Sequence, residues 1–132
     1  MKQKTYYHII LDQSGSMQDC IKPTISGFNE QVQVVQSLQE RFPNQEVFMG
    51  LTRFNDEVHH TAFAMQAQLM TMLSVHTYRP SGSTALFDAI GSSVKKLQTE
   101  LKAELREELT KVVTVIITDG YENASTVYSQ IL

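Results

Sequence analysis

Five oxygen-bearing side chains in this sequence could form one metal site. Two are carboxylates, Asp12 and Asp119, and three are hydroxyls, those of Ser14, Ser16 and Thr84. Such oxygens suit a hard divalent cation like Mg²⁺, which prefers about six oxygen ligands in a near-octahedral arrangement and keeps several waters. The thiolates and clustered histidines that softer metals prefer do not accompany them. The residue types therefore predict a Mg²⁺ site, with Mn²⁺ or Ca²⁺ as related ions.

The spacing of the first three residues supports a shared ligand. Ser14 and Ser16 are separated only by Gly15, so a tight turn can direct both hydroxyls to one side. The alternative is that Asp12 only caps a turn or a helix, because Asp and Ser favour such places. Thr84 could likewise be simply the N-cap of the helix that follows it. The presence of all five residues, at positions that could come together in the fold, favours the metal site over these capping roles.

Two buried strands would bring these residues together. Residues 6–11 and 111–118 are nearly continuous apolar runs, typical of strands buried on both faces of a sheet, and each ends at an aspartate, Asp12 or Asp119. Open α/β sheets bind ligands outside the carboxyl ends of their strands. If the two strands are neighbours, both aspartates face one crevice, which Thr84 enters at the start of a helix.

The remaining apolar patterns predict alternating helices and strands. The expected elements are a helix at about 23–42, a strand at 46–54 with a hairpin partner at 57–64, a short amphipathic helix at 66–75, and a long helix at about 85–109. The order strand, helix, hairpin, helix, strand predicts an α/β sheet with helices on both faces. We expect one domain covering residues 1–132.

Composition excludes several classes of function. The chain has 132 residues, 42% of them hydrophobic, and a net charge of -3 from 11 basic and 14 acidic side chains. This mild charge gives no basic field for nucleic acid and no polybasic membrane signal. No run approaches the roughly 20 apolar residues of a membrane span, and no signal peptide is recognisable. The chain is therefore expected to be soluble and cytoplasmic, and its single cysteine, Cys20, suits a reduced intracellular compartment.

Three short motifs give the chain a family resemblance. Residues 12–17 (Asp-Gln-Ser-Gly-Ser-Met), 82–86 (Gly-Ser-Thr-Ala-Leu) and 117–120 (Ile-Thr-Asp-Gly) resemble the three parts of the metal-ion-dependent adhesion site of von Willebrand factor type A (VWA) domains. All five site positions match, and the motifs occur in the family's order. The resemblance covers nearly the whole chain.

The resemblance implies both a fold and a function. The fold would be a Rossmann-like three-layer sandwich, whose mostly parallel sheet has an antiparallel hairpin strand at one edge. The function would be metal-dependent protein binding, without catalysis. The hydroxyls of Ser14, Ser16 and Thr84 would contact the ion, while the aspartates often act through water. A carboxylate from an Asp or Glu of the protein partner would complete the ion's ligands.

The sequence also departs from the VWA pattern. Such domains usually continue for two more strands and helices after the Thr-Asp-Gly motif, whereas this chain stops 13 residues past Asp119. We therefore expect a domain truncated at its C-terminus and missing its last strands. The strand at 111–118 would then form an exposed apolar edge, which favours association, so a homodimer through this strand is a further hypothesis.

Enzymatic functions are the main alternative. A strand-end aspartate such as Asp12 can accept a phosphoryl group in a metal-dependent hydrolase or phosphotransfer enzyme. Phosphatases of the haloacid dehalogenase type, however, have a second aspartate two residues later, where this chain has Ser14. No Gly-x-Ser-x-Gly elbow and no phosphate-binding glycine loop is present. A structural fragment with an empty site is a third possibility, which the five intact residues oppose.

Two groups of residues outside the site are interpreted as structural. His8 lies inside the first apolar strand and is expected to be a core residue with a hydrogen-bond partner. The methionines at positions 65, 70 and 72 are expected to fill the core, because unbranched thioethers adapt to irregular gaps.

Overall fold

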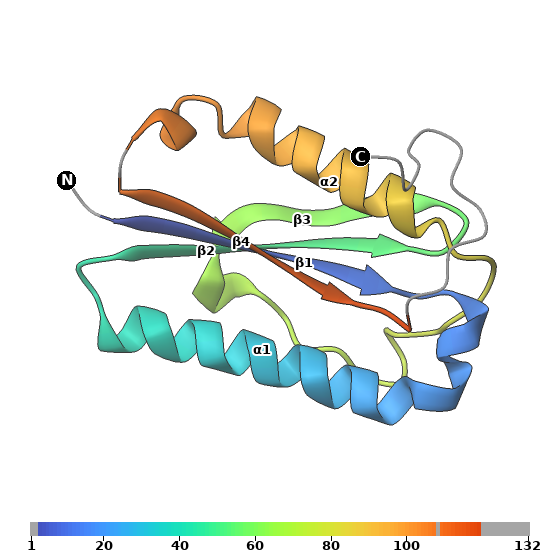
Figure 1. The fold of residues 1–132 in the computed structure, drawn as a ribbon. Helices are drawn as coiled ribbons and strands as arrows, with labels where there is room; N and C mark the ends of the chain where they lie inside the picture. The colour runs from blue at the N-terminus through green and yellow to red at the C-terminus, as the bar shows by residue number, and fades with distance from the viewer. Residues whose placement is uncertain (1–2, 108, 120–132) are drawn as a thin grey trace.

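Helices on both faces enclose a four-stranded sheet in the computed structural model, which describes residues 3–107 and 109–119 (Figure 1). Helix α1 lies on one face and helix α2 on the other. The strands are β1 (Lys4–Asp12), β2 (Glu46–Phe54), β3 (Val58–Gln66) and β4 (Thr110–Ile117), and the helices are α1 (Ile21–Arg41) and α2 (Leu86–Glu100). Across the described residues, the sheet order is β3-β2-β1-β4.

Strand direction brings three carboxyl ends to one edge of the sheet. β1 pairs in parallel with both β2 and β4, placing Asp12 opposite Phe54 and Leu11 opposite Ile117. β3 is antiparallel to β2 and is the outermost strand of the described sheet on the side away from β4. The predicted fold class, a mostly parallel α/β sandwich with an antiparallel edge strand, is confirmed.

The central strand is apolar on both faces because a helix covers each one. Ile9 and Leu11 pack into the core on the α1 side, whereas Ile10 packs on the α2 side against Leu86 and Ala89. The three β1 residues are between 0% and 1% exposed. Their burial on both faces explains the continuous apolar run in the sequence.

Helix α1 agrees with the predicted helix at 23–42, except at its start. A 3-10 turn over Gly15–Cys20 leads directly into it, so the helix begins at Ile21. Its buried face consists of Thr24, Phe28, Val32 and Val35, which recur at intervals of three and four.

The predicted helix at 66–75 is wrong. Only the 3-10 turn Ala67–Leu69 forms there. Side chains of α1 explain the difference, because they satisfy backbone groups that a helix would bond internally. Asn29 bonds both the N–H (2.7 Å) and the carbonyl (3.0 Å) of Leu73, and Gln36 donates to the carbonyl of Ala67 (3.0 Å). The segment is thereby held in an irregular conformation along the edge of the core.

The predicted long helix at 85–109 is also wrong in its last third. Helix α2 ends at Glu100, and only a 3-10 turn, Glu104–Arg106, follows before β4. Leu97 and Leu101 are buried, but Leu105 is 40% exposed. Beyond Leu101 the apolar stripe is therefore only partly covered, and the chain turns back to enter the sheet.

Strand β4 lies at one edge of the described part of the sheet. Two of its apolar side chains, Val113 and Ile116, are 39% and 43% exposed. Association of two chains through this strand stays a prediction, because β4 pairs only with β1 within the described residues.

A polar cluster around the buried Thr52 links the sheet to α2. The hydroxyl of Thr52 lies 2.7 Å from Nε2 of His8, 2.8 Å from Nδ1 of His60 and 3.0 Å from the hydroxyl of Ser93. A hydroxyl has one proton and two lone pairs, so these three bonds use its full capacity. His8 is 2% exposed, and burial, with the nearby His60 and Lys96, lowers its pKa to about 4. The interpretation of His8 as a bonded core residue is confirmed.

Stability should fall as the solution is acidified below the ordinary pKa of histidine. In the unfolded chain His8 binds a proton near its reference pKa of about 6.5, whereas in the folded chain it resists protonation down to about 4. The unfolded state therefore binds more protons between these values, and acid favours unfolding. We expect the free energy of unfolding, measured by urea denaturation, to drop by about 2 kcal/mol between pH 7 and pH 5.

Two variants identify the residue responsible. His8→Gln should lose most of this pH dependence, whereas His76→Gln, in an exposed loop, should retain it. An unchanged pH dependence in His8→Gln would contradict the assignment.

Candidate metal-ion site

Asp12 lies at the carboxyl end of β1 and is fully buried, with 0% exposure. Its Oδ1 accepts bonds from the backbone N–H (2.8 Å) and the hydroxyl (2.6 Å) of Ser14. Its Oδ2 accepts a bond from the hydroxyl of Thr118 (2.7 Å), which follows β4. The bond to the Ser14 N–H is the turn that the capping alternative predicts. Capping alone does not explain the full burial of the carboxylate or its bond to a second strand end.

The two serine hydroxyls lie side by side. Oγ of Ser14 and Oγ of Ser16 are 3.2 Å apart, with Ser14 fully buried and Ser16 exposed. Two neighbouring ligands of an octahedral Mg²⁺ lie about 3.0 Å apart when each is about 2.1 Å from the ion. The serine pair therefore fits adjacent positions around one small cation.

Thr84 is 3% exposed and is carried by a loop that is bonded to its surroundings. The carbonyl of Gly82 accepts a bond from the N–H of Gly15 (2.8 Å), which joins this loop to the serine turn. The N–H of Ala85 donates to the carbonyl of Asn55 (2.7 Å). Ala85 is the N-cap of α2, so Thr84 lies one residue before the capping position, and its simple capping role is not observed.

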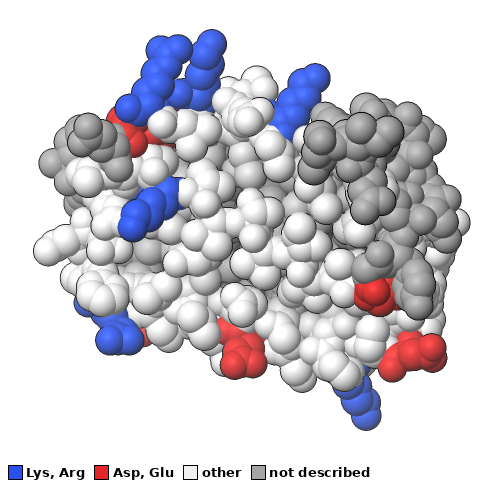
Figure 2. Space-filling model, viewed as in Figure 1, with Lys and Arg blue, Asp and Glu red and all other residues white. Residues whose placement is uncertain are grey.

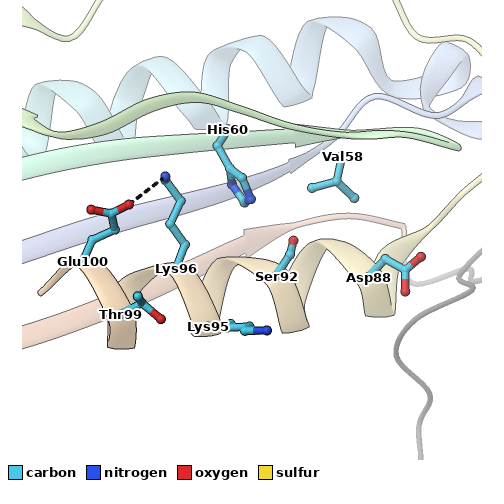
Figure 3. A pocket seen from close by; sticks show the side chains of 8 residues that line it. All are labelled: Val58, His60, Asp88, Ser92, Lys95, Lys96, Thr99 and Glu100. Atoms are coloured by element: carbon cyan, nitrogen blue, oxygen red, sulfur yellow. Dashed lines mark ion pairs between the residues drawn. The ribbon is translucent and has the colours of Figure 1, made fainter. Parts of the chain in front are cut away.

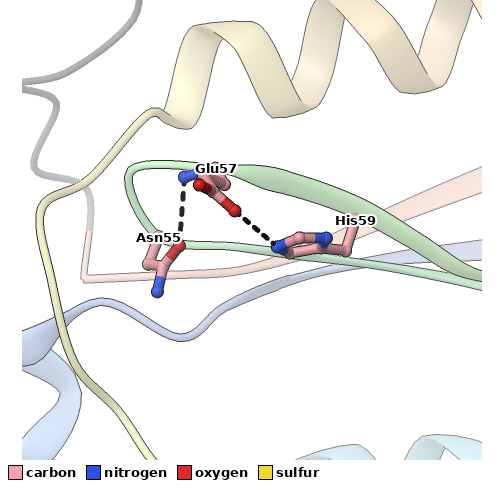
Figure 4. A network of polar contacts seen from close by, with 3 residues as sticks. All are labelled: Asn55, Glu57 and His59. Carbon is pink, nitrogen blue, oxygen red and sulfur yellow. Dashed lines mark hydrogen bonds and ion pairs between the residues drawn. The ribbon is translucent and has the colours of Figure 1, made fainter.

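The hairpin turn between β2 and β3 supports this loop from the other side. Oδ1 of Asn55 accepts the backbone N–H of Glu57 at 3.0 Å, and the carboxylate of Glu57 pairs with His59 at 3.3 Å (Figure 4). These contacts fix the turn whose Asn55 carbonyl holds Ala85, and hence the start of α2.

Asp119 is exposed and follows the end of β4. Its neighbour Thr118 bonds Asp12, so the ends of β1 and β4 meet as the sequence predicts if the two strands are neighbours. Thr118 was not assigned a role from the sequence, although it belongs to the third motif. Its contact with Asp12 depends on the parallel pairing of β4 with β1, which the sequence does not specify.

The electrostatics of Asp12 favour a bound cation. Among the described residues, no cationic side chain forms an ion pair with this fully buried carboxylate. A buried carboxylate without a counter-charge is destabilising by several kcal/mol in order of magnitude. The described part of the chain contains no group of three or more His, Cys, Asp or Glu residues that could hold a metal ion. A cation here would therefore bind a hydroxyl-rich ligand set, which suits a hard ion and not a soft one.

Tyr78 is a further residue of the site that sequence reasoning missed. It is 1% exposed, and its hydroxyl donates a 2.5 Å hydrogen bond to the backbone carbonyl of Asp12. Burial, with the nearby Asp12 carboxylate, raises the pKa of Tyr78, so the phenol stays protonated as a donor. No spacing pattern identifies Tyr78, because it lies in an irregular loop 66 residues from its partner.

Gly82 should be difficult to replace. Its φ of +83° is a conformation that residues with a Cβ rarely adopt, and an added Cβ would lie 2.3 Å from Oδ1 of Asp56. Asp56 is exposed and can rotate away, so the backbone penalty dominates. We expect Gly82→Ala to lower the free energy of unfolding by about 1–2 kcal/mol in a denaturant titration.

A second glycine provides a matched control. Gly27 lies inside α1, and a Cβ there meets nothing within 4 Å. Gly27→Ala should raise the free energy of unfolding by about 0.5–1 kcal/mol. If Gly82→Ala were as stabilising as Gly27→Ala, the conformational requirement at Gly82 would be wrong.

A pocket of 580 Å³ lies elsewhere, between β3 and α2 (Figure 3). His60 faces it from β3, and Lys96 lies on the helix side, 3.5 Å from the carboxylate of Glu100. Lys96 also lies 4.9 Å from the ring centre of Phe63. Lys96 thus has partners within the chain, and the pocket contains none of the five predicted site residues.

Charged side chains do not form a continuous patch on the face shown in Figure 2. Lys and Arg side chains lie mainly around its periphery, acidic residues are interspersed with them, and uncharged residues fill the centre. The described residues on this face therefore form no continuous basic surface of the kind that binds nucleic acid.

The motifs and the geometry agree with a comparison of the sequence with known families. The model of the von Willebrand factor type A domain matches residues 8–131. The chain belongs to this family. VWA domains typically bind a divalent metal, often act as metal-dependent protein-interaction modules, and are generally not enzymes. No curated protein sequence matches this VWA domain.

Solved structures support the same fold. The crystal structure of the ArnB paralog VWA2 from Sulfolobus acidocaldarius matches with a TM-score of 0.61 and 16% sequence identity. The match covers 93% of this chain but only 29% of that one, so this VWA domain spans less than a third of that protein. At this identity, the similarity concerns the fold alone. Within the described residues of the present chain, no helix is long and apolar enough to cross a bilayer.

Proposed function

We propose that this VWA domain binds Mg²⁺, or the related ions Mn²⁺ and Ca²⁺, and uses the ion to bind a carboxylate of a protein partner. One observation carries the proposal. A fully buried carboxylate, Asp12, has no cationic side chain paired with it among the described residues, and two serine hydroxyls at its side are 3.2 Å apart. A cation would neutralise Asp12 and take both hydroxyls as ligands.

The five residues have different roles in this proposal. The hydroxyls of Ser14, Ser16 and Thr84 would hold the ion, and the carboxylates of Asp12 and Asp119 would balance its charge and orient bound water. Asp12 also fixes the hydroxyl of Ser14 through the 2.6 Å bond, which positions one ligand in advance. When bound, the ion would supply a Lewis-acidic position for an oxygen of the partner.

Charge balance explains why the partner should offer an anion. Only two carboxylates belong to the set, and neutral hydroxyls make up the rest, so the cation keeps a strong affinity for one more negative ligand. Exposure indicates the direction of approach. Ser16 and Asp119 are exposed, whereas Asp12, Ser14 and Thr84 are buried, so the open side of the site is the solvent side.

Peptide binding tests this function. A library of short peptides with a central Asp or Glu, measured by fluorescence anisotropy, should contain sequences that bind in Mg²⁺ but not in chelator. Changing the central Asp of a binding peptide to Asn should abolish binding, as should Asp119→Asn in the protein. Glu40→Gln, an exposed acid in α1, is the matched control and should leave binding unchanged.

Two results would contradict the proposal. The first is peptide binding that is equally strong in chelator. The second is turnover of a phosphate ester that Asp12→Asn abolishes, because this would identify a hydrolase or phosphotransfer enzyme acting through Asp12.

A further inference from the structure

A second pocket lies against the α1-facing side of β2 and β3, beneath the irregular segment that follows β3. Its volume is 300 Å³. Its walls are mainly aliphatic and thioether side chains, including Leu51, Met65, Met70 and Leu73. The one charged side chain that lines it is Arg53.

Arg53 occupies an unusual place for a cation. Along β2, alternate residues point to the same face, and Val47, Met49 and Leu51 all pack into the core on the α1 side. Arg53 is the next residue in this row, close to the carboxyl end of the strand. The charged side chain of Arg53 therefore lies next to three apolar side chains of the same strand face and lines a mainly apolar pocket.

The guanidinium of Arg53 is only partly satisfied. Its Nη2 donates to the backbone carbonyl of Thr77, but its Nε is buried and has no hydrogen-bond partner among the described residues. Burial lowers the pKa of Arg53. Within the described part of the chain no carboxylate pairs with it. Its cross-strand neighbour, His59, already pairs with Glu57 (Figure 4).

These observations specify a ligand chemistry. A half-buried charge without a counter-ion is unfavourable, and buried polar atoms in native proteins nearly always have partners. The guanidinium fork matches a carboxylate in shape and charge, and the thioether walls adapt to an apolar body of varied shape. Small-molecule pockets typically have about 300–1,000 Å³ and apolar walls with a few polar groups, as here.

We propose that this pocket binds a small amphipathic carboxylate, with the acid on Arg53 and the apolar body against the methionine and leucine side chains. A straight-chain fatty acid of medium length has this chemistry. The pocket is separate from the five metal-site residues, none of which lines it. Binding is therefore expected whether or not the metal site is loaded.

Decanoate is the probe that tests the proposal, used in chelator and below its micelle-forming concentration. Calorimetry should show saturable binding of one decanoate per chain. The methyl NMR signals of Met65, Met70 and Met72, which line the pocket, should shift, while that of Met17, which is buried in the core but does not line the pocket, should not. Decanol, which keeps the apolar body but lacks the acid, should bind about tenfold or more weakly.

Two protein variants separate the acid contact from a general effect on folding. Arg53→Met keeps the length of the side chain but not the charge, and should weaken decanoate binding about tenfold or more. Met72→Glu adds a negative charge at a residue that is 41% exposed, so it should fold normally and also weaken binding. Circular dichroism checks that each variant is folded.

Each contrary result overturns the proposal. These results are no saturable decanoate binding, equal affinity for decanol, methyl shifts at Met17 in place of the three pocket methionines, or wild-type affinity in either folded variant. Because the measurements are made without metal, none of these results depends on the function proposed for the five-residue site.

Discussion

Asp12→Ala should abolish the rise in melting temperature that Mg²⁺ or Mn²⁺ gives the wild-type protein. An ion that binds only the folded state stabilises it by about 2.7 kcal/mol when present at about 100 times its dissociation constant. Asp12 is the buried charge at the centre of the site, and it fixes Ser14 and Thr118 through short hydrogen bonds. Its removal takes away both the charge balance and the positioning, so we expect metal affinity to fall about 100-fold or more. Differential scanning fluorimetry with and without the ion measures the effect.

Two controls separate loss of the ion from loss of the fold. Asp12→Asn keeps the size of the side chain and can still bond Ser14, so it should fold but respond weakly to the ion. Asp56→Asn changes an exposed acid in the adjacent hairpin turn and should keep the full response. The metal site would be ruled out if wild type showed no shift, or if Asp12→Ala showed the same shift.

Tyr78→Ala should cause the largest loss of stability among the variants considered. The ring is 1% exposed and belongs to the core cluster beneath α1, and truncating a buried aromatic side chain costs about 3–5 kcal/mol. The variant also removes the hydroxyl that donates a hydrogen bond to the backbone carbonyl of Asp12. Urea denaturation at pH 7 should give this loss in the free energy of unfolding.

Tyr78→Phe isolates the hydroxyl contribution. It keeps the ring but removes the hydroxyl with its 2.5 Å bond to Asp12, and should cost about 1 kcal/mol. Tyr7→Phe is the matched control, because the Tyr7 hydroxyl makes no hydrogen bond in the described part of the structure. The free energy of unfolding of this variant should equal that of the wild type. Equal losses at both positions would show that the bond to Asp12 is not a specific support of the site.

The sequence predicted the sheet well because its strands have strong local signals. The strand at 46–54 was predicted with its exact bounds, and the apolar runs that end at Asp12 and Asp119 identified β1 and β4. The sequence does not determine whether these two strands pair, and the structure shows that they do. The helices were less predictable, because their ends depend on tertiary contacts. Asn29 and Gln36 hold the segment after β3 out of a helix, which no local pattern reveals.

The residues of the candidate site, too, could be predicted only in part from the sequence. The serine turn could be recognised directly, because Ser14 and Ser16 are neighbours in the sequence. The supporting residues could not, because Tyr78 and Thr118 act on Asp12 across 66 and 106 positions. Arg53 was not singled out either, since a lone arginine in a strand pattern gives no indication of whether it is paired. Contacts of this range follow from the topology and not from local spacing.

The hydrogen bond between Thr118 and Asp12 has a kinetic consequence. It joins nearly opposite ends of the described chain, so the proposed ion site is complete only after β4 has docked beside β1. Closing a loop of this length is entropically expensive and tends to occur late in folding. Metal binding would then stabilise the native state more than the folding transition state. The ion would act chiefly by slowing unfolding, and would leave the rate of folding nearly unchanged.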